Sequence, residues 1–484
     1  MKQPELMDER SLTTPKNRSF MAMLGLQPET AWIAILGLVF LTAICIVIKA
    51  GTILRIAFPA GATAIGVWLY LKYPLMYVSY TWWIWFTAPF VRRLADWQAG
   101  WQDPNPILLA PFLVTFISFL TLYRHLPKAN REGSIAFILP LIGIIYALLI
   151  GLIQRSPTAV VVPFLNWITP VLLGLHLFAH WRDYPSYSKT LRTTFLWGVL
   201  VTGVYGVYQY IVAPEWDTSW LINTELITGG KPEPYGMRVF STMNSAGPFS
   251  IVMMAGLLLL FSTFSPLQFP ATMGGYLSFL LTLVRSAWLG WGIGLLTLAT
   301  SLKPKLQMRL MLTIVVMVLC ILPLTTMEQF SESINSRFET LTDLQNDQSF
   351  NDRSGNYEEN LNKALTEWLG KGLGGSGEHI DSAVLDTLFS LGWLGTVFYA
   401  GGLLLLLIKL FLDSEGGSDS FASATRGICL SIFVMLIFSS LMLGLSGAVF
   451  WGFLGIGTAA NRYNQYQKQI HKLQKHNLSV SQMS

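Results

Sequence analysis

Apolar runs of about 17–25 residues alternate with short polar segments along most of the chain, and a run of that length can cross a bilayer as a helix. About fourteen such runs are predicted. They begin near residues 32, 56, 75, 107, 134, 158, 194, 245, 268, 286, 309, 384, 427 and 446. The pattern predicts an all-α, polytopic membrane helical bundle of about 12–14 transmembrane helices. The final run, Gly427–Ala460, is long for one helix and short for two, so both interpretations stay open.

The composition agrees with a membrane protein. Of the 484 residues, 52% are hydrophobic and 12% are charged, whereas a soluble domain carries roughly 25% charged residues. The first thirty residues are polar and have no short apolar core with a cleavage signature, so Ile33–Ile48 is predicted as an uncleaved first span. Cys45, Cys320 and Cys429 lie far apart within apolar runs, which indicates buried thiols and no disulfide framework.

Lysine and arginine residues in short loops favour the cytoplasmic side of a membrane. Three basic loops follow the fourth, sixth and tenth predicted spans. Even numbers of spans separate them, so they lie on the same side of the membrane: Arg124, Lys128 and Arg131; Arg182, Lys189 and Arg192; Lys303, Lys305 and Arg309. Both termini join that side if the final run is two helices. The predicted segments are a cytoplasmic tail (1–30), a first group of spans (31–327), an extracytoplasmic loop (328–383), C-terminal spans (384–460) and a basic cytoplasmic tail (461–484). Exceptions to the rule fall on the outer side: Lys49, Arg55, Arg92, Arg93 and Arg155.

The extracytoplasmic loop is acidic. Between Glu328 and Asp381 it contains eleven acidic and four basic residues, a net charge of −7. Such a loop does not attract polyanions through its net charge, so no nucleic-acid partner is expected, and an anion site there must be built from individual arginines. Apolar residues at helical spacing predict an amphipathic helix over Asn356–Leu369, and the glycines that follow predict its end and a pliant turn.

Arg285 lies between two apolar runs, in FLLTLVRSAWLGWGIGLL. A charged side chain exposed to lipid at such a position is unfavourable by about 3 kcal/mol or more. By the predicted topology this junction faces outward, so Arg285 either lines an outward-facing cavity or reaches the interface or an acidic partner. Three further arginines lie in outward segments: Arg238 in GMRVFSTMN, Arg337 in INSRFETL and Arg353 in FNDRSGN. Taken singly, each is more often a surface residue than a ligand.

Together with their neighbours these arginines form an ordered set of motifs. Arg238 precedes a turn and Asn244; Thr282, Arg285, Ser286, Ala287 and Trp288 form T-x-x-R-S-A-W. Arg353 precedes Trp368 and the turn with Gly372 and Gly374, and Leu388, Leu391, Gly392, Leu394 and Gly395 form L-x-x-L-G-x-L-G. Over residues 236–400 this order resembles the O-antigen ligase and polysaccharide polymerase family of bacterial envelope glycosyltransferases. Ligases of the family usually carry a His-Asn pair about eleven residues before the glycine that corresponds to Gly392. Here Asp381 and Ser382 stand at that place, with His379 two residues earlier, and an Asp there looks more like the polymerases.

The resemblance implies a glycosyltransferase of the cytoplasmic (inner) membrane, with a polyprenyl-diphosphate-linked oligosaccharide as donor and a glycan or lipid-glycan as acceptor. Arg238, Asn244, Arg285, Arg337, Arg353 and Trp288 are then candidates for binding diphosphate or sugar. Guanidinium groups bind phosphate oxygens bidentately and can stabilise a departing diphosphate without a metal ion, and no cofactor is expected. The acceptor hydroxyl needs a general base, for which Asp381 and His379 are the candidates. Ligation and polymerisation both remain possible.

Two alternatives to this hypothesis remain, one for Trp288 and one for the whole protein. Trp288 can be an interfacial anchor, the commoner role of tryptophan in membrane proteins. The whole protein can be a solute transporter, for example of a bicarbonate-like anion. Transporters usually carry charged groups near the bilayer midplane and related halves. Here the charged residues gather at one side and no repeat is evident, which favours the glycosyltransferase. The sequence does not predict an oligomeric state.

Overall fold

The structure is a computed structural model that describes residues 27–128, 133–225, 227–263, 265–301, 307–308, 311, 314–315, 360–375, 382–412, 419–437 and 439–481. Over these residues it consists of helices and connecting turns, without a strand. The N-terminal half contains α2 (Glu29–Val47), α3 (Gly51–Lys72), α4 (Pro74–Ala99), η1 (Pro106–Leu108), α5 (Leu109–Phe116), α6 (Phe119–His125), η2 (Leu126–Lys128), α8 (Ile135–Gln154), α9 (Pro157–Ala179), η3 (Trp181–Asp183) and α10 (Tyr184–Val212). The C-terminal half contains α11 (Glu215–Thr224), η4 (Ile227–Gly229), α12 (Ala246–Leu260), α13 (Gln268–Leu281), α14 (Arg285–Ser301), α18 (Ala383–Leu412), α19 (Ser420–Met435) and α20 (Gly444–Ser481).

The chain is a multi-pass, all-α membrane protein, as its hydropathy predicts. Among the described residues seven helices are long and apolar enough to cross a membrane. They are Glu29–Val47, Gly51–Lys72, Pro106–His125, Ile135–Gln154, Pro157–Ala179, Trp181–Val212 and Ala383–Leu412. Ala246–Leu260 and Ser420–Met435 are shorter apolar helices. Most of the span predicted to begin near residue 309 lies outside the described residues.

The structure adds detail to the prediction at three places. The final apolar run is two helices, because α19 ends at Met435 and α20 begins at Gly444. The predicted basic tail after residue 460 continues the last helix, since α20 extends to Ser481. Of the predicted amphipathic helix Asn356–Leu369, the described part is helical only over 360–366, and residues 368–369 form a bend.

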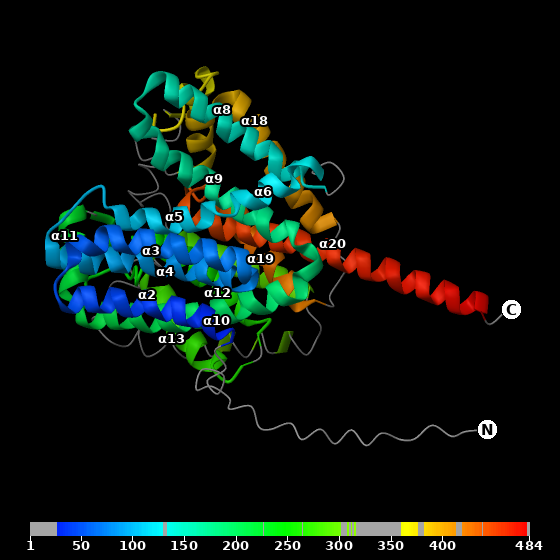
Figure 1. Cartoon of the computed structure of the whole chain (residues 1–484), viewed down its shortest axis with the longest axis horizontal. Coiled ribbons are helices and arrows are strands. Elements are labelled where there is room, and N and C mark those ends of the chain that lie inside the picture. The colour runs from blue at the N-terminus through cyan, green and yellow to red at the C-terminus, as the bar shows by residue number, and fades with distance from the viewer. Residues whose placement is uncertain are drawn as a thin grey trace, which may run out of the picture.

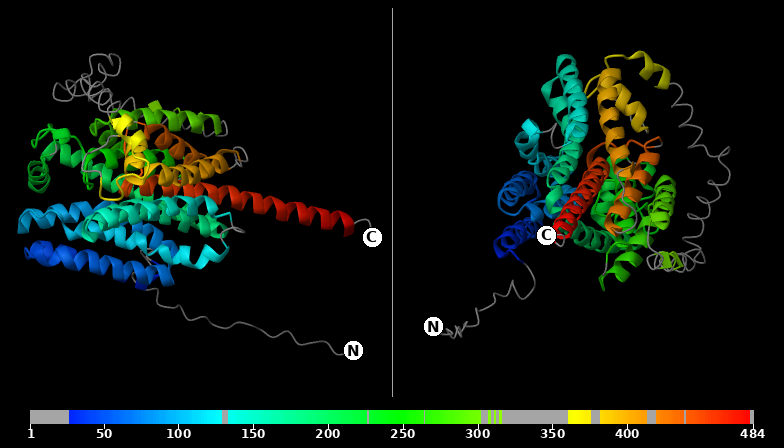
Figure 2. Two further views of the ribbon diagram at one scale, coloured as in Figure 1. Left: turned by 90° about the horizontal axis from the view of Figure 1, so that it is seen from above. Right: turned by 90° about the vertical axis from the view of Figure 1, so that its right-hand side faces the viewer.

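Most helices lie side by side in one bundle (Figure 1), with α11 at one end and the C-terminal part of α20 projecting from the other. These are called the α11 end and the α20 end below. Figure 2 shows that α20 passes through the bundle before it projects beyond it. Within the bundle α20 packs against α9, α10 against α13, and α14 against α19.

The helices α8 and α18 pair with each other and stand at a steep angle above the others in Figure 1. Their contact depends on small residues, because a Cβ added at Gly143 would lie 2.5 Å from the carbonyl oxygen of Gly395. Inside α18, Gly392 has φ 64° and ψ −177°, a conformation nearly restricted to glycine. The resulting kink receives the glycine turn after residue 369, since the amide of Lys371 donates to the carbonyl of Phe389 at 2.7 Å.

The glycine turn is therefore docked and not pliant as predicted. The amide of Leu373 donates to the carbonyl of Ala147 on α8 at 3.1 Å. Before the turn, Ala364 is fully buried against Leu385, Leu388 and Phe389 of α18, whereas 72% of Trp368 is exposed. The apolar face of this short helix thus packs on α18, and the residues after it remain at the surface.

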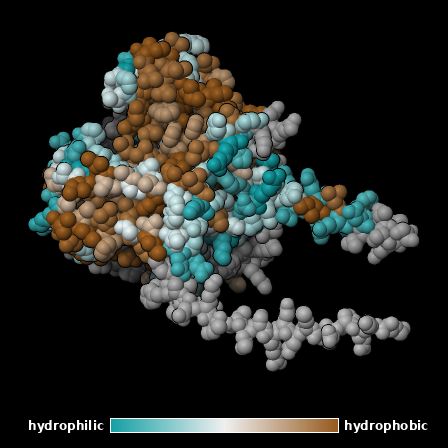
Figure 3. All heavy atoms as spheres, in the orientation of Figure 1, coloured by the Kyte–Doolittle hydropathy of each residue, from teal (hydrophilic) through white to brown (hydrophobic). Residues whose placement is uncertain are grey.

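The surface of the bundle is suited to lipid. Large apolar side chains are widely exposed, with 68% of Phe40, 65% of Ile53 and 81% of Ile153 accessible. Figure 3 shows hydrophobic residues over much of the bundle's side and hydrophilic residues gathered where α20 leaves it. So much exposed apolar surface is unfavourable in water, and a bilayer around the bundle accounts for it.

Candidate functional site

The first two predicted motifs meet at the α11 end. The guanidinium of Arg238 donates from Nε to the carbonyl of Thr282 at 3.0 Å and from NH2 to that of Leu283 at 3.1 Å. Its NH1 group donates to the carbonyl of Thr228 at 3.0 Å. In addition, the amide of Val239 donates to the carbonyl of Leu281 at 3.0 Å. The chain around Arg238 is thereby held on the turn that precedes Arg285, although 44 residues separate Arg238 from Thr282.

Arg285 is the first residue of α14 and is half-buried. It does not sit in the middle of a span: α13 ends at Leu281, and the turn 282–284 between the helices includes Leu283 at φ 54°. The N-terminus of a helix carries a partial positive charge, which adds to that of the guanidinium. We call Arg238, Arg285 and the turn 282–284 together the arginine junction.

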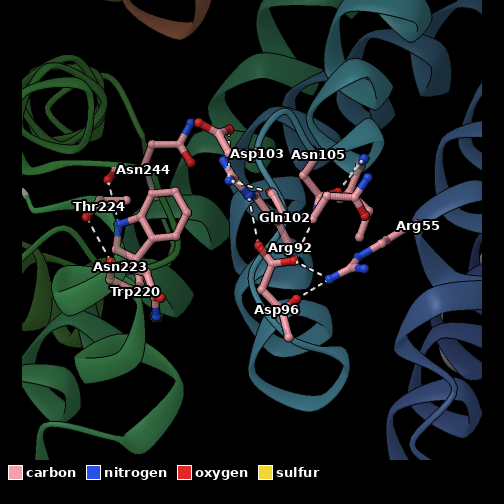
Figure 4. Close-up of polar contacts among 12 residues, drawn as sticks. Arg55, Arg92, Asp96, Gln102, Asp103, Asn105, Trp220, Asn223, Thr224 and Asn244 are labelled. Carbon is pink, nitrogen blue, oxygen red and sulfur yellow. Dashed lines mark hydrogen bonds and ion pairs between the residues drawn. The ribbon is translucent and has the colours of Figure 1, made fainter.

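Trp288 and Asn244 flank the arginine junction in different ways. Trp288 lies one turn after Arg285, is half-buried, and donates from its indole nitrogen to the carbonyl of Phe279 at 3.4 Å. Asn244 has an exposed side chain, and its backbone carbonyl accepts a hydrogen bond from the indole of Trp220 at 3.2 Å. Asn244 therefore lies beside α11 (Figure 4).

Arg337, Arg353, His379 and Asp381 lie outside the described residues. The chain is described again from Ser382, and the amide of Ala383 donates to the carbonyl of Leu436 at 3.0 Å, just after α19. Since α19 packs against α14, the described chain resumes next to the helix that Arg285 begins.

Asp386 is a carboxylate that the sequence analysis missed. It lies in the first turn of α18, only 8% exposed, and accepts hydrogen bonds from the hydroxyls of Ser390 at 3.2 Å and Ser440 at 2.7 Å. The signal in the sequence was an acid inside the apolar run that carries L-x-x-L-G-x-L-G. An acid at such a position needs buried partners, because an unpaired carboxylate there would be strongly unfavourable.

Three of the outer-side exceptions to the charge rule, Arg55, Arg92 and Arg93, belong to a buried ionic network near the α11 end. Asp96 of α4 accepts from Arg55 at 2.8 Å, from Asn105 at 2.8 Å and from Arg92 at 3.1 Å. Arg92 also pairs with Asp103 at 3.2 Å. Figure 4 shows these side chains converging from α3, α4 and the segment after α4. Buried charges of this kind persist only when they are paired and hydrogen-bonded.

A further ion pair of the network joins α4 to α11. Arg93 and Asp217 lie 2.6 Å apart, and neither side chain has any exposed surface. Asp217 also accepts hydrogen bonds from the hydroxyl of Tyr205 and from the side-chain amide of Gln209, both at 2.7 Å. Arg93 donates to the carbonyl of Ser241 at 2.5 Å.

Ser241 is held in an uncommon backbone conformation between these groups, with φ 51°. The side-chain oxygen of Gln209 accepts from the amides of Phe240 at 3.0 Å and Ser241 at 2.8 Å. The ionic network therefore fixes the segment 238–244, which begins at Arg238 and ends at Asn244. Asp96 follows Arg92 by four residues on one helix, a spacing that signals an ion pair, but the sequence analysis noticed Arg92 only as an exception. The pairing of Arg93 with Asp217 is not evident from spacing.

Comparison with known proteins adds no assignment: no family model matches the chain, and no curated protein is significantly similar to it. Among the described residues no group of three His, Cys, Asp or Glu side chains is placed to hold a metal ion. The arginine junction and the ionic network beside it form the candidate site.

Proposed function

We propose that this protein is a membrane glycosyltransferase that transfers an oligosaccharide from a polyprenyl diphosphate to a sugar hydroxyl on the outer side of the cytoplasmic membrane. The observation that carries the proposal is the arginine junction. Arg238 is held on the carbonyls of Thr282 and Leu283, directly before Arg285 and the N-terminus of α14. One arginine is thus bound to the turn directly before a second arginine that begins a helix, and a lipid-borne diphosphate would lie at this end of the bundle.

The chemistry of this reaction calls for such a site. When the bond between sugar and diphosphate breaks, negative charge grows on the departing diphosphate. Positive groups already fixed in place stabilise that charge without reorganising, and guanidinium groups stay charged at any working pH. The ionic network holds the segment 238–244 in position, so that it does not have to order itself around the substrate.

The acceptor hydroxyl is deprotonated by Asp381 or His379 in this proposal, and Arg337 and Arg353 complete the diphosphate site. The backbone hydrogen bond between Ala383 and Leu436 supports this assignment, because it holds the start of α18 beside the end of α19, the helix that packs against α14. Asp386 is occupied by Ser390 and Ser440 and is better suited to anchoring this return than to acting as the base.

The test is lipid binding by the full-length protein in nanodiscs, with C55 polyprenyl diphosphate as the probe and the C55 polyprenyl alcohol as reference. Wild-type protein is expected to prefer the diphosphate, and Arg285→Ala to weaken that binding about tenfold or more, as for loss of one charge-assisted contact. Arg155→Ala is the matched control, since Arg155 is another outward arginine but donates to the carbonyl of Gly375 at 3.3 Å.

With the native lipid-linked donor purified from producing cells, both Arg285→Ala and Arg285→Lys are expected to abolish transfer while the protein still inserts. Lysine keeps the charge but loses the bidentate geometry. Equal binding of diphosphate and alcohol by the wild type, or full transfer by Arg285→Ala, would refute the proposal.

A further inference from the structure

Two arginines lie near Asp419 at the α20 end, the other end of the bundle from the arginine junction. Arg192 belongs to α10, whose first residue Tyr184 packs against Tyr463 of α20 with ring centroids 5.7 Å apart. Arg426 belongs to α19. Each arginine precedes by one or two residues the predicted start of an apolar run, near residue 194 or 427. Both guanidinium groups are therefore expected at the level where lipid headgroups meet hydrocarbon.

Asp419 attracts both arginines electrostatically, but its oxygens already accept other hydrogen bonds. It caps the N-terminus of α19 by accepting from the amides of Phe421 at 3.0 Å and Ala422 at 3.2 Å. The hydroxyl of Tyr184 donates to its second oxygen. Arg192 approaches the carboxylate only to 3.9 Å, which is too long for a hydrogen bond.

The two guanidinium groups therefore have more donors than partners. Among the described residues Arg192 donates no hydrogen bond: its Nε–H is buried without an acceptor, and the group lies 5.0 Å from the ring centroid of Phe421. Arg426 is only 6% exposed and donates to the hydroxyl of Ser423 at 3.0 Å. Buried donors of a charged group are unfavourable without acceptors, so an acceptor from outside the chain would stabilise this cluster.

A ligand can reach the cluster from the side of α10. Of the Arg192 side chain 29% is exposed, and the exposed Lys189 lies three residues earlier on the same face of the helix. Lys189, Arg192 and Arg426 carry three positive charges, whereas Asp419 carries one negative charge. The cluster therefore has a surplus of positive charge, unlike the ionic network at the α11 end, where three arginines are paired with three aspartates.

We propose that Lys189, Arg192 and Arg426 form a binding site for a phosphate group, either that of an anionic phospholipid or free inorganic phosphate. Phosphate oxygens accept hydrogen bonds from a guanidinium group bidentately, and their charge offsets the surplus. Lys189 and Arg192 contact the phosphate directly, and the deeper Arg426 adds its charge from behind. The level of the site in the membrane favours the lipid, because basic sites at the headgroup level bind anionic lipids.

The test is native mass spectrometry of the full-length protein in detergent, titrated with dioleoylphosphatidylglycerol. The reference is dioleoylphosphatidylcholine, in which choline neutralises the phosphate. Wild-type protein is expected to bind phosphatidylglycerol more tightly, and Arg192→Ala to raise its Kd about tenfold, as for loss of one charge-assisted contact. Arg182→Ala is the matched control, since Arg182 is a basic residue of the same end but is exposed to water and lies 5.0 Å from the ring centroid of Trp181.

Asp419→Asn distinguishes a phosphate site from an internal ion pair. Asparagine caps a helix about as well as aspartate does, so α19 keeps its first turn while the opposing negative charge is removed. The Kd for phosphatidylglycerol is therefore expected to fall about two- to fivefold, as for a partly exposed charge. If Asp419 serves only to hold Arg192 in place, the same variant weakens lipid binding instead.

Equal Kd values for the two lipids, equal effects of Arg192→Ala and Arg182→Ala, or weaker binding by Asp419→Asn would overturn the phosphate site. Given selective binding that depends on Arg192, excess inorganic phosphate distinguishes the two sources. Displacement of phosphatidylglycerol identifies free phosphate as a ligand of the site, and retention identifies the lipid. Arg192→Ala should leave glycosyl transfer unchanged, because the arginine junction lies at the α11 end, so this inference and the proposed function can fail separately.

Discussion

The substitution Asp217→Asn tests the ionic network most directly. It replaces a carboxylate by an amide of nearly the same shape, so it leaves no cavity, but it removes the charge opposite Arg93. Both side chains are completely buried and 2.6 Å apart. Removing one partner of such a pair leaves an uncompensated charge, which generally destabilises a protein by about 3–5 kcal/mol.

The matched control lies in the same network. Asp103→Asn removes the partner of Arg92 at 3.2 Å, but the Asp103 side chain is 66% exposed. Water screens that charge and Arg92 keeps Asp96, so the expected loss is at most about 1 kcal/mol. Burial, and not the presence of an ion pair, is therefore expected to set the difference between the two variants.

The assay is equilibrium unfolding of the detergent-solubilised protein by increasing SDS, followed by circular dichroism, with free-energy differences taken from midpoint shifts at a common slope. The double variant Arg93→Met with Asp217→Leu removes both charges and is expected to recover most of the loss. The carbonyl of Ser241, which loses Arg93 as a donor in this variant, still accepts from the side-chain amide of Gln209 at 3.3 Å. If Asp217→Asn and Asp103→Asn destabilise the protein equally, the reasoning from burial is refuted.

Two further predictions concern the glycine kink and the general base. Gly392→Ala should destabilise by at least about 2 kcal/mol in the same assay, because of its φ of 64° and because the new Cβ would lie 2.4 Å from the carbonyl carbon of Leu369. Gly401→Ala, in the same helix with no atom within 4 Å, should be neutral or stabilise by up to about 1 kcal/mol; equal effects would contradict the packing argument. Asp381→Asn should slow transfer about 100-fold or more with C55 polyprenyl diphosphate binding intact, and near-normal turnover would point to His379 or to no side-chain base.

The helical bundle was predictable because its cause is local. A run of apolar residues long enough to cross a bilayer must satisfy its own backbone hydrogen bonds, and a helix does so within one segment. The predicted starts near residues 134, 158 and 384 accordingly fall close to those of α8, α9 and α18. The same reasoning placed Arg285 at a junction between two apolar runs, and α13 indeed ends and α14 begins there.

The prediction was less accurate where a segment depends on its neighbours. Amphipathic spacing extended one helix to Leu369, but the described helix ends at residue 366 and the chain then turns into the kink at Gly392. The glycines after residue 369 were read as a flexible turn. Their close contacts with α8 and α18 cannot be inferred from composition, because they depend on how those helices cross.

The sequence by itself determined the membrane class, the positions of spans such as α8, α9 and α18, and the place of Arg285 at a junction between apolar segments, since hydropathy acts within each segment. Only the tertiary structure decided which charges are paired. Arg93 looked like an outer-side exception until its partner Asp217 and the carbonyl of Ser241, 148 residues further along the chain, were found beside it. A buried charge is stable only next to its counter-charge, and chain folding, not sequence spacing, brings the two together.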